Sequence, residues 1–164
     1  MIARYVPLAA FLLLVTLSSL TGSGFEAGEW YYFTMRQPSW WPPGWFFVLA
    51  WTVVYITMAL AAWNTWITGH YSRTGAITWW VLLLVLNVCW FAVFFGLHRP
   101  GYSLLLLSVM AGMSLFCMRA FSKLSRQAAL MMLPYLFWII CLWLLNLAIW
   151  SYNGGPLEPL FWKP

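Results

Sequence analysis

Apolar stretches close to the length of a membrane span fill most of the chain, and short polar breaks separate them. A helix that crosses a bilayer needs roughly 20 mostly apolar residues. Five stretches approach this length, and we expect spanning helices over residues 5–22, 44–67, 76–97, 101–119 and 128–151. The predicted fold class is therefore an all-α membrane protein, a single bundle of five transmembrane helices that forms one domain over residues 1–164.

The first stretch has an alternative interpretation as a secretory signal, because Arg4 precedes an apolar run. The run is long for such a signal, and no clear small-x-small cleavage site follows it. We therefore expect a retained helix. N-terminal sequencing of the mature protein distinguishes the two interpretations.

Composition agrees with the membrane class, since 64% of the residues are hydrophobic and only 7% are charged. A water-soluble domain of this size cannot cover its surface with so few charges. We expect an integral membrane protein in contact with membrane lipids. The short loops favour a bacterial cell membrane.

Basic residues are distributed unevenly between the two ends of the predicted bundle. Those on the N-terminal side are Arg4, Arg73, Arg119, Lys123 and Arg126. The other side carries fewer, together with all three acids: Arg36, Arg99, Lys163, Glu26, Glu29 and Glu158. The positive-inside rule then places the N-terminus in the cytoplasm if the chain is in an inner membrane. This asymmetry accounts for the net charge of +5 and does not indicate nucleic acid.

Conventional catalytic and metal-binding patterns are missing from the sequence. It contains no Asp, and Glu26 and Glu29 lie beside a glycine in a loop, where a solvated charge is the commoner arrangement. Cys89, Cys117 and Cys141 lie singly in three different spans, without the Cys/His spacing of a metal site. We therefore predict no metal and no obligate cofactor.

Two asparagines, Asn87 and Asn146, lie inside predicted spans. An unpaired buried amide costs about 1–3 kcal/mol, so each must find a partner. That partner is a neighbouring helix, a broken stretch of backbone or a ligand, and the amides alone favour the helix.

The faces that these asparagines share are rich in aromatic residues. Helical spacing puts each on one face with its neighbours, and a further aromatic pair shares a face of the second span. The three faces comprise Asn87, Trp90 and Phe94; Trp138, Leu142 and Asn146; and Trp51 and Tyr55. Together they suggest a cavity with tryptophan and asparagine in its walls.

Three motifs resemble those of the TspO/translocator protein family, the tryptophan-rich sensory proteins related to the peripheral benzodiazepine receptor. The first runs through residues 28–58 as GEWY, PSW, PPGW and AWT. The second, in residues 86–96, reads LN, W and FFG, and the third, in residues 134–153, reads PYL, W, LN and YN. The motifs occur in the family's order and cover most of the chain.

The resemblance implies a five-helix bundle, usually a homodimer, with a pocket beneath the long first loop. Family members bind porphyrins such as protoporphyrin IX, and in some lineages sterols. Motif matching implies these pocket residues: Tyr31, Tyr32, Trp40, Trp51, Tyr55, Asn87, Trp90, Phe94, Trp138 and Asn146. We expect Leu142 to narrow the pocket and Arg36 to meet a propionate at its rim.

The leading functional hypothesis is a membrane sensor, receptor or carrier that binds porphyrin-type tetrapyrroles. In it, Trp51 and Trp138 sandwich the ligand, and the two asparagines donate hydrogen bonds to it. One alternative is light-dependent porphyrin degradation with Trp51 and Trp138 as electron donors. The other is binding or transport of a sterol, lipid or carotenoid in a pocket narrowed by bulky fifth-span residues.

Overall fold

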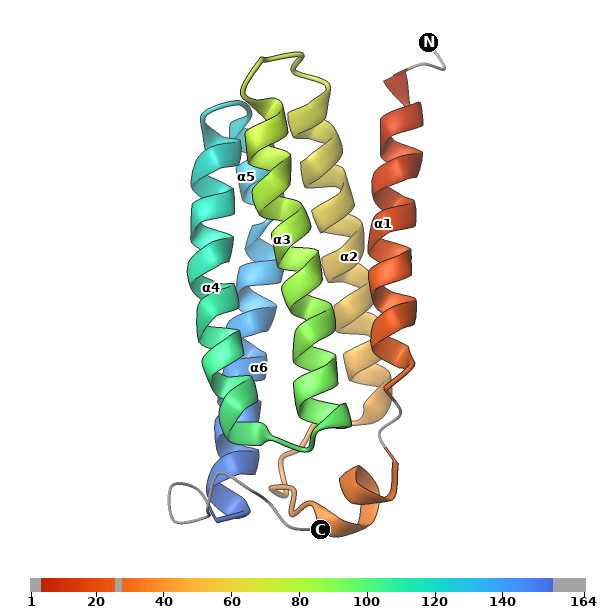
Figure 1. Cartoon of the computed structure of the whole chain (residues 1–164), viewed down its shortest axis with the longest axis vertical. Helices are drawn as coiled ribbons and strands as arrows, with labels where there is room; N and C mark the ends of the chain where they lie inside the picture. The colour runs from red at the N-terminus through yellow and green to blue at the C-terminus, as the bar shows by residue number, and fades with distance from the viewer. Residues whose placement is uncertain (1–3, 26–27, 155–164) are drawn as a thin grey trace.

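The computed structural model describes residues 4–25 and 28–154, which form long helices packed side by side (Figure 1). The α-helices are α1 (Val6–Ser23), α2 (Gly44–Trp66), α3 (Arg73–Phe91), α4 (Pro100–Ser122), α5 (Arg126–Met131) and α6 (Leu133–Tyr152). Two short π-helices, η2 (Trp30–Thr34) and η3 (Ala92–Gly96), precede α2 and extend α3. The described residues contain no strand.

The helices form a closed ring whose order differs from their order in the chain. Helix α1 packs against α2 and α3, α2 packs against α5 and α6, and α4 packs against α3 and α6. The ring therefore runs α1, α2, α5–α6, α4, α3. The segments Gly44–Trp66, Arg73–Gly96, Pro100–Ser122 and Arg126–Tyr152 are long and apolar enough to cross a membrane, and Val6–Gly22 is a shorter apolar helix. This all-α bundle of an integral membrane protein confirms the predicted fold class.

The predicted fifth span consists of two helices, because Pro134 lies in the first turn of α6. Proline lacks the N–H that would continue the hydrogen-bond ladder of α5. Helix α5 begins two residues before the predicted start, where the Ser125 hydroxyl caps it by accepting from the Ala128 N–H at 3.2 Å. The same hydroxyl donates to Asn64 Oδ1 at 2.6 Å and so attaches the start of α5 to α2.

The end of α3 widens into η3, where the Leu97 N–H donates to the Ala92 carbonyl at 2.8 Å. This five-residue step adds one residue to the turn and changes the direction of the side chains that follow. The turn into α4 then passes through His98, whose φ of 53° is in the left-handed region. Pro100 starts α4, where its missing N–H is unneeded.

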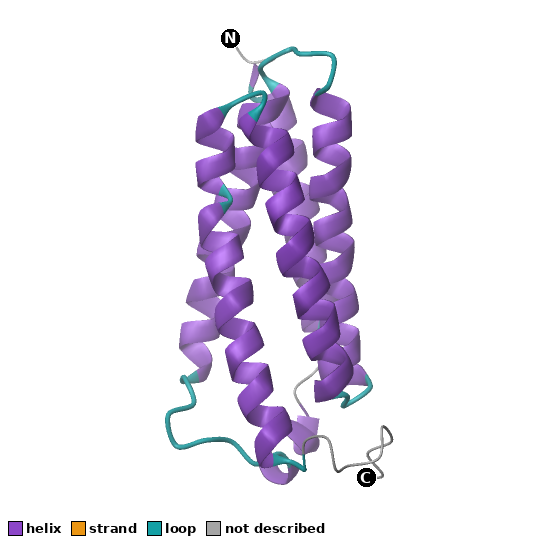
Figure 2. Cartoon of the chain, turned by 90° about the vertical axis from the view of Figure 1, so that its left-hand side faces the viewer, coloured by secondary structure: helices purple, strands orange, loops and turns teal. Residues whose placement is uncertain are grey.

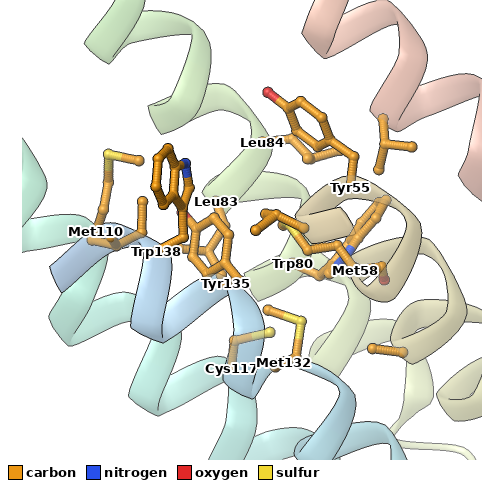
Figure 3. Packing of buried hydrophobic residues seen from close by; sticks show 14 of the residues in the cluster. Tyr55, Met58, Trp80, Leu83, Leu84, Met110, Cys117, Met132, Tyr135 and Trp138 are labelled. Carbon is orange, nitrogen blue, oxygen red and sulfur yellow. Dashed lines mark hydrogen bonds between the residues drawn. The ribbon is translucent and has the colours of Figure 1, made fainter. Parts of the chain in front are cut away.

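Close packing fills the centre of the bundle (Figure 3). The fully buried Trp80 of α3 donates from Nε1 to the Met58 carbonyl of α2 at 3.0 Å. Phe11 of α1 meets the Trp80 ring edge-on, with centroids 5.4 Å apart. Figure 3 shows Tyr135 and Trp138 of α6 reaching the same region as Leu83 of α3.

Small residues of α1 face α3. Gly22 is buried, and a Cβ there would lie 2.6 Å from the Phe91 ring. Ser18, one turn earlier, is buried and donates to the Leu84 carbonyl of α3 at 3.4 Å. This pair therefore serves packing within the chain. Gly112 of α4, by contrast, has open space where its Cβ would be.

The start of α1, the α2–α3 connection and the α4–α5 connection lie at one end of the bundle (Figure 1). Basic residues mark this end. Arg73 places its guanidinium 4.4 Å from the Trp66 ring and donates to the Trp66 carbonyl at 3.2 Å. Arg119 lies in the last turn of α4, where a cation interacts favourably with the helix dipole.

The loop of residues 35–43 crosses the opposite end, between η2 and α2 (Figure 2). Asn153, just after α6, holds this loop with two hydrogen bonds. Its Oδ1 accepts from the Arg36 N–H at 2.9 Å, and its Nδ2 donates to the Arg36 carbonyl at 3.0 Å. One side chain thus fixes the backbone of a loop that is 117 residues away in sequence.

We predict that Asn153→Ala releases this loop, because each lost hydrogen bond contributes about 0.5–1.5 kcal/mol. The measurement is the rate at which trypsin cuts after the exposed Arg36, which should rise several-fold. Ser151→Ala is the matched control, since within the described residues the Ser151 hydroxyl bonds to Leu147 of its own helix. Equal cleavage rates in the two variants would contradict the clamp.

Candidate ligand-binding site

A cavity of about 830 Å³ lies between the loop of residues 35–43 and the middle of the bundle. Its deepest α2 residue, Ile56, is 12 residues past the start of that helix at Gly44, or about 18 Å along the axis. The volume is within the range of about 300–1,000 Å³ that is typical of small-molecule sites. The cavity is therefore large enough for a flat polycyclic ligand.

Four helices and the loop contribute the walls, and α4 contributes no lining residue among those described. The lining residues are Leu12, Val15, Thr16, Ser19 and Leu20 of α1; Tyr31, Tyr32, Gln37, Trp41, Pro42 and Pro43 of η2 and the loop; Gly44, Phe47, Val48, Trp51, Thr52, Tyr55 and Ile56 of α2; Trp90, Phe91, Phe94 and Phe95 of α3 and η3; and Leu142, Leu145 and Asn146 of α6.

Two stacked aromatic pairs form part of these walls. The Trp51 and Tyr55 rings have centroids 5.2 Å apart and planes inclined by 24°. The Trp90 and Phe94 rings are 5.5 Å apart and inclined by 19°. Helical spacing of four residues produces both pairs, because side chains at i and i+4 lie on one face. The flat ring faces suit an aromatic ligand.

The lining is uncharged throughout the described residues. Both threonine hydroxyls of the lining already donate within the chain: Thr16 donates to the Leu12 carbonyl at 2.8 Å, and Thr52 donates to the Val48 carbonyl at 2.7 Å. His, Cys, Asp and Glu form no group of three among the residues that the structure describes. The site is therefore suited to an apolar ligand with few polar groups.

The loop closes the cavity through a hydrogen-bonded group of side chains. Trp41 Nε1 donates to the Tyr31 hydroxyl at 2.9 Å, and Gln37 Nε2 donates to the Tyr31 carbonyl at 3.1 Å. Burial raises the pKa of the Tyr31 phenol, the hydrogen bond from Trp41 lowers it by less, and the neighbouring Tyr32 raises it. The phenol therefore stays neutral and keeps accepting from Trp41 at ordinary pH.

The cavity reaches the lipid-facing surface between α1 and α2. Its lining includes Leu20, which is 62% exposed, and Val48, which is 69% exposed. Ile56 of α2, about two turns deeper than Val48, is also exposed. A ligand dissolved in the bilayer therefore has a lateral route into the site that bypasses the loop.

The structure brings eight of the predicted site residues together in this lining. They are Tyr31, Tyr32, Trp51, Tyr55, Trp90, Phe94, Leu142 and Asn146. They come from four separate segments of the chain, so the convergence is a property of the fold.

Four predicted residues lie outside the lining. Trp40 is 57% exposed, and its neighbour Trp41 lines the cavity instead. The Arg36 residue is exposed and is held through its main chain by Asn153. Asn87 is buried deeper, between α3 and α6, where its Nδ2 donates to the Leu83 carbonyl at 3.0 Å and lies 3.4 Å from the Tyr135 hydroxyl.

Trp138 lies behind Trp51, so the two indoles do not form parallel walls. Their centroids are 6.1 Å apart, and their planes are inclined by 84°. Trp138 also meets the rings of Phe46 and Phe47 edge-on. The expected sandwich between parallel rings is therefore not formed in this structure: Trp51 lines the cavity, and Trp138 packs against it outside the lining.

Leu142 lines the cavity, as the helical face predicts, whereas the bulky Trp143 next to it does not. Trp143 Nε1 donates to the Ser108 hydroxyl of α4 at 3.1 Å, on the outside of the bundle. Of these two large fifth-span residues, only Leu142 takes up room in the site.

Sequence reasoning missed the wall that α1 provides. Leu12, Thr16 and Ser19 are four and three residues apart and so share a helical face. The sequence does not reveal this face because nearly all of α1 is apolar. Its inward-facing and outward-facing residues therefore do not differ in hydrophobicity. Phe91 and Phe95 of the α3–η3 segment were missed as well, since their exact direction depends on the π-turn.

Comparison with known proteins assigns the chain to a family. The translocator protein of Homo sapiens is 30% identical over 156 residues, 92% of this chain and 92% of that protein. Protein CrtK of Rhodobacter capsulatus is 30% identical over 150 residues, covering 90% and 92%. The tryptophan-rich protein TspO of Chlorobaculum tepidum is 33% identical over 136 residues, covering 80% and 86%. Residues 7–151 match the TspO/MBR family as a whole, and the chain belongs to that family.

Proposed function

We propose that this protein binds a porphyrin-type tetrapyrrole in the cavity and acts as a membrane sensor or carrier for it. The observation that carries the proposal is the uncharged, aromatic lining of an 830 Å³ cavity with Trp51 in its wall. A flat macrocycle gains both apolar burial and ring contacts in such a site. Membership of a family that includes sensory and translocator proteins supports the same role.

The charged propionates of a porphyrin need water or polar partners, which the deep lining does not offer. The loop end provides them, because Tyr31, Tyr32 and Gln37 lie there and Arg36 is exposed nearby. The macrocycle would enter with its propionates toward the loop and its apolar edge toward Tyr55. This orientation keeps the charges near the membrane interface.

We predict that protoporphyrin IX quenches the tryptophan fluorescence of the purified protein saturably at micromolar concentration. Trp51→Phe should weaken binding about two- to tenfold, because the smaller ring loses part of a stacking contact worth about 0.5–1.5 kcal/mol. The measurement is a fluorescence titration of both proteins in the same detergent.

Trp79→Phe is the control for this titration. Trp79 is exposed on the outer face of α3, where its ring stacks on Phe116 with centroids 6.2 Å apart. It should bind the porphyrin as the unmodified protein does. Quenching that never saturates, in any of the three proteins, would reject the proposal.

A second candidate function is light-dependent breakdown of the bound porphyrin. The observation in its favour is that Trp51 lies in the wall, stacks on Tyr55 and meets Trp138 edge-on. An indole at this position could give an electron to a photoexcited porphyrin, and the adjoining rings could share the resulting radical. No acid–base pair is needed for that step.

We predict that, in light and oxygen, the Soret band of the bound porphyrin decays faster with this protein than in detergent alone. Trp51→Phe and Trp138→Phe should both slow the decay severalfold, since each removes an electron donor from the group of adjoining rings. The measurement is absorbance under constant illumination at saturating protein. Equal decay in Trp138→Phe and Trp79→Phe would contradict the degradation function and leave porphyrin binding unaffected.

A further inference from the structure

Three exposed cations lie close together where α4 connects to α5. Arg119 and Lys123 are four residues apart and share a face at the end of α4, and Arg126 is the first residue of α5. The connection is tight, because the Ser125 N–H donates to the Phe121 carbonyl at 2.7 Å. The three cations form what we call the basic turn.

The described part of the chain supplies no anion to the basic turn. Glu29 is the one acidic residue that the structure describes, and it precedes η2 at the opposite end of the bundle. Arg73, at the same end as the basic turn, is held by the ring and the carbonyl of Trp66. The three side chains of the basic turn have no such hydrogen bond or ion pair within the described residues. Their counter-charge therefore has to come from outside this part of the chain.

A row of exposed apolar side chains runs along α4 from the basic turn toward the membrane interior. Leu105, Val109 and Phe116 are all exposed, and helical spacing puts them on the same face as Arg119 and Lys123. The distance from Leu105 to Phe116 is about 16 Å along the helix axis. This is close to one leaflet of a bilayer, whose whole hydrocarbon core is about 30 Å thick.

Helix α5 and the start of α6 repeat this arrangement beside α4. The helices α4 and α5 pack against each other. Leu130, Leu133 and Phe137 are exposed and follow Arg126 at intervals of four, seven and eleven residues. On both sides of the connection, the cations thus lie at the membrane boundary and apolar side chains lie on the bilayer side of them.

This combination defines the chemistry of the partner. A soluble anion would compensate the cations but leave the apolar rows uncovered. A zwitterionic lipid would cover the rows, but its headgroup brings a cation of its own. An anionic phospholipid satisfies both parts, since guanidinium and ammonium groups bind phosphate through charge-assisted hydrogen bonds and the acyl chains cover apolar surface.

We propose that the basic turn and the exposed rows of α4 and α5–α6 bind an anionic phospholipid, with its phosphate at the three cations and its chains along the rows. None of the three cations lines the cavity. The lipid site is therefore separate from the proposed porphyrin site and does not depend on it.

Lipid retention by the full-length protein tests the proposal. The protein is immobilised in a neutral detergent and equilibrated with equal amounts of dioleoylphosphatidylglycerol and dioleoylphosphatidylcholine, which have identical chains. After washing, mass spectrometry of the extracted lipid gives the ratio of the two. We expect an enrichment of the anionic lipid of about fivefold to tenfold, because each nearby basic residue contributes roughly a fivefold factor. At about 0.5 M salt the enrichment should fall, since screening shortens the range of the attraction.

Substitutions in the basic turn separate a site from a general effect of positive charge. The triple variant Arg119→Gln, Lys123→Gln, Arg126→Gln should lose the enrichment, and Arg126→Gln alone should reduce it two- to fivefold. Arg4→Gln is the matched control, because Arg4 is exposed at the same end but precedes α1, which lies across the ring from α4 and α5 (Figure 1). It removes one charge and should leave the enrichment unchanged.

A charge-conserving variant and a soluble anion complete the test. Arg119→Lys with Arg126→Lys should keep most of the enrichment, whereas a change in folding would remove it in this variant too. Replacing chloride with inorganic phosphate at equal ionic strength should not displace the lipid, because phosphate cannot cover the apolar rows.

The inference is overturned if the triple variant retains the enrichment, if Arg4→Gln reduces it as much as Arg126→Gln does, or if inorganic phosphate displaces the lipid. The last outcome would indicate a simple anion site. A protoporphyrin IX titration of the triple variant keeps this result distinct from the proposed function. The variant should bind the porphyrin as the unmodified protein does, whichever way the lipid measurement turns out.

Discussion

The absence of water in the bilayer core constrains this structure most strongly, because every polar atom buried there must be paired within the chain. The bundle meets this demand with few side chains. Trp80 bonds to Met58, Ser18 bonds to Leu84, and Asn146 bonds to Ser103. Each of these bonds joins two different helices, so the pairing of polar atoms also fixes which helices are neighbours.

Exceptions to this pairing are informative for the same reason. Seven buried side-chain N or O atoms of the described residues lack a partner, and three of them belong to cavity residues: Tyr55, Trp90 and Asn146. The Tyr55 hydroxyl lies beside Ser18 without meeting hydrogen-bond geometry. Closely packed regions elsewhere leave less room for a polar group to change partners. The three atoms have almost no accessible surface, so they lie within the cavity wall and do not border its open volume.

The number of spans and several cavity residues could be predicted from the sequence, because length, apolar composition and helical spacing are local properties. Trp51 and Tyr55, for example, share a helical face whatever surrounds them. The division of the fifth span at Met132 was hidden because Pro134 is compatible with either a kinked helix or a new first turn. The sequence also does not show which of Trp40 and Trp41 lines the cavity. In a loop, unlike a helix or strand, no regular spacing distinguishes residues that face inward from those that face outward.

The direction of the amides could not be predicted at all. Helical spacing places Asn146 on the correct face, but its Nδ2 donates to the Ser103 hydroxyl, which is 43 residues away in sequence. The orthogonal arrangement of Trp51 and Trp138 is another consequence of tertiary contact, since Phe46 and Phe47 fill the space beside Trp138. Residue identity and spacing predicted part of the lining, and the packing of the helices decided which of the predicted side chains reach the cavity.

Because of the lateral opening between α1 and α2, the relevant concentration of a ligand is its concentration in the membrane and not its concentration in water. A molecule that enters past Leu20 and Val48 comes from the hydrocarbon phase, where an apolar compound accumulates far above its aqueous level. Lipid tails are present in the same phase at very high concentration, and they compete for the same volume. Occupancy therefore depends on the mole fraction of ligand among lipids, so membrane composition itself would control the protein at a constant aqueous supply.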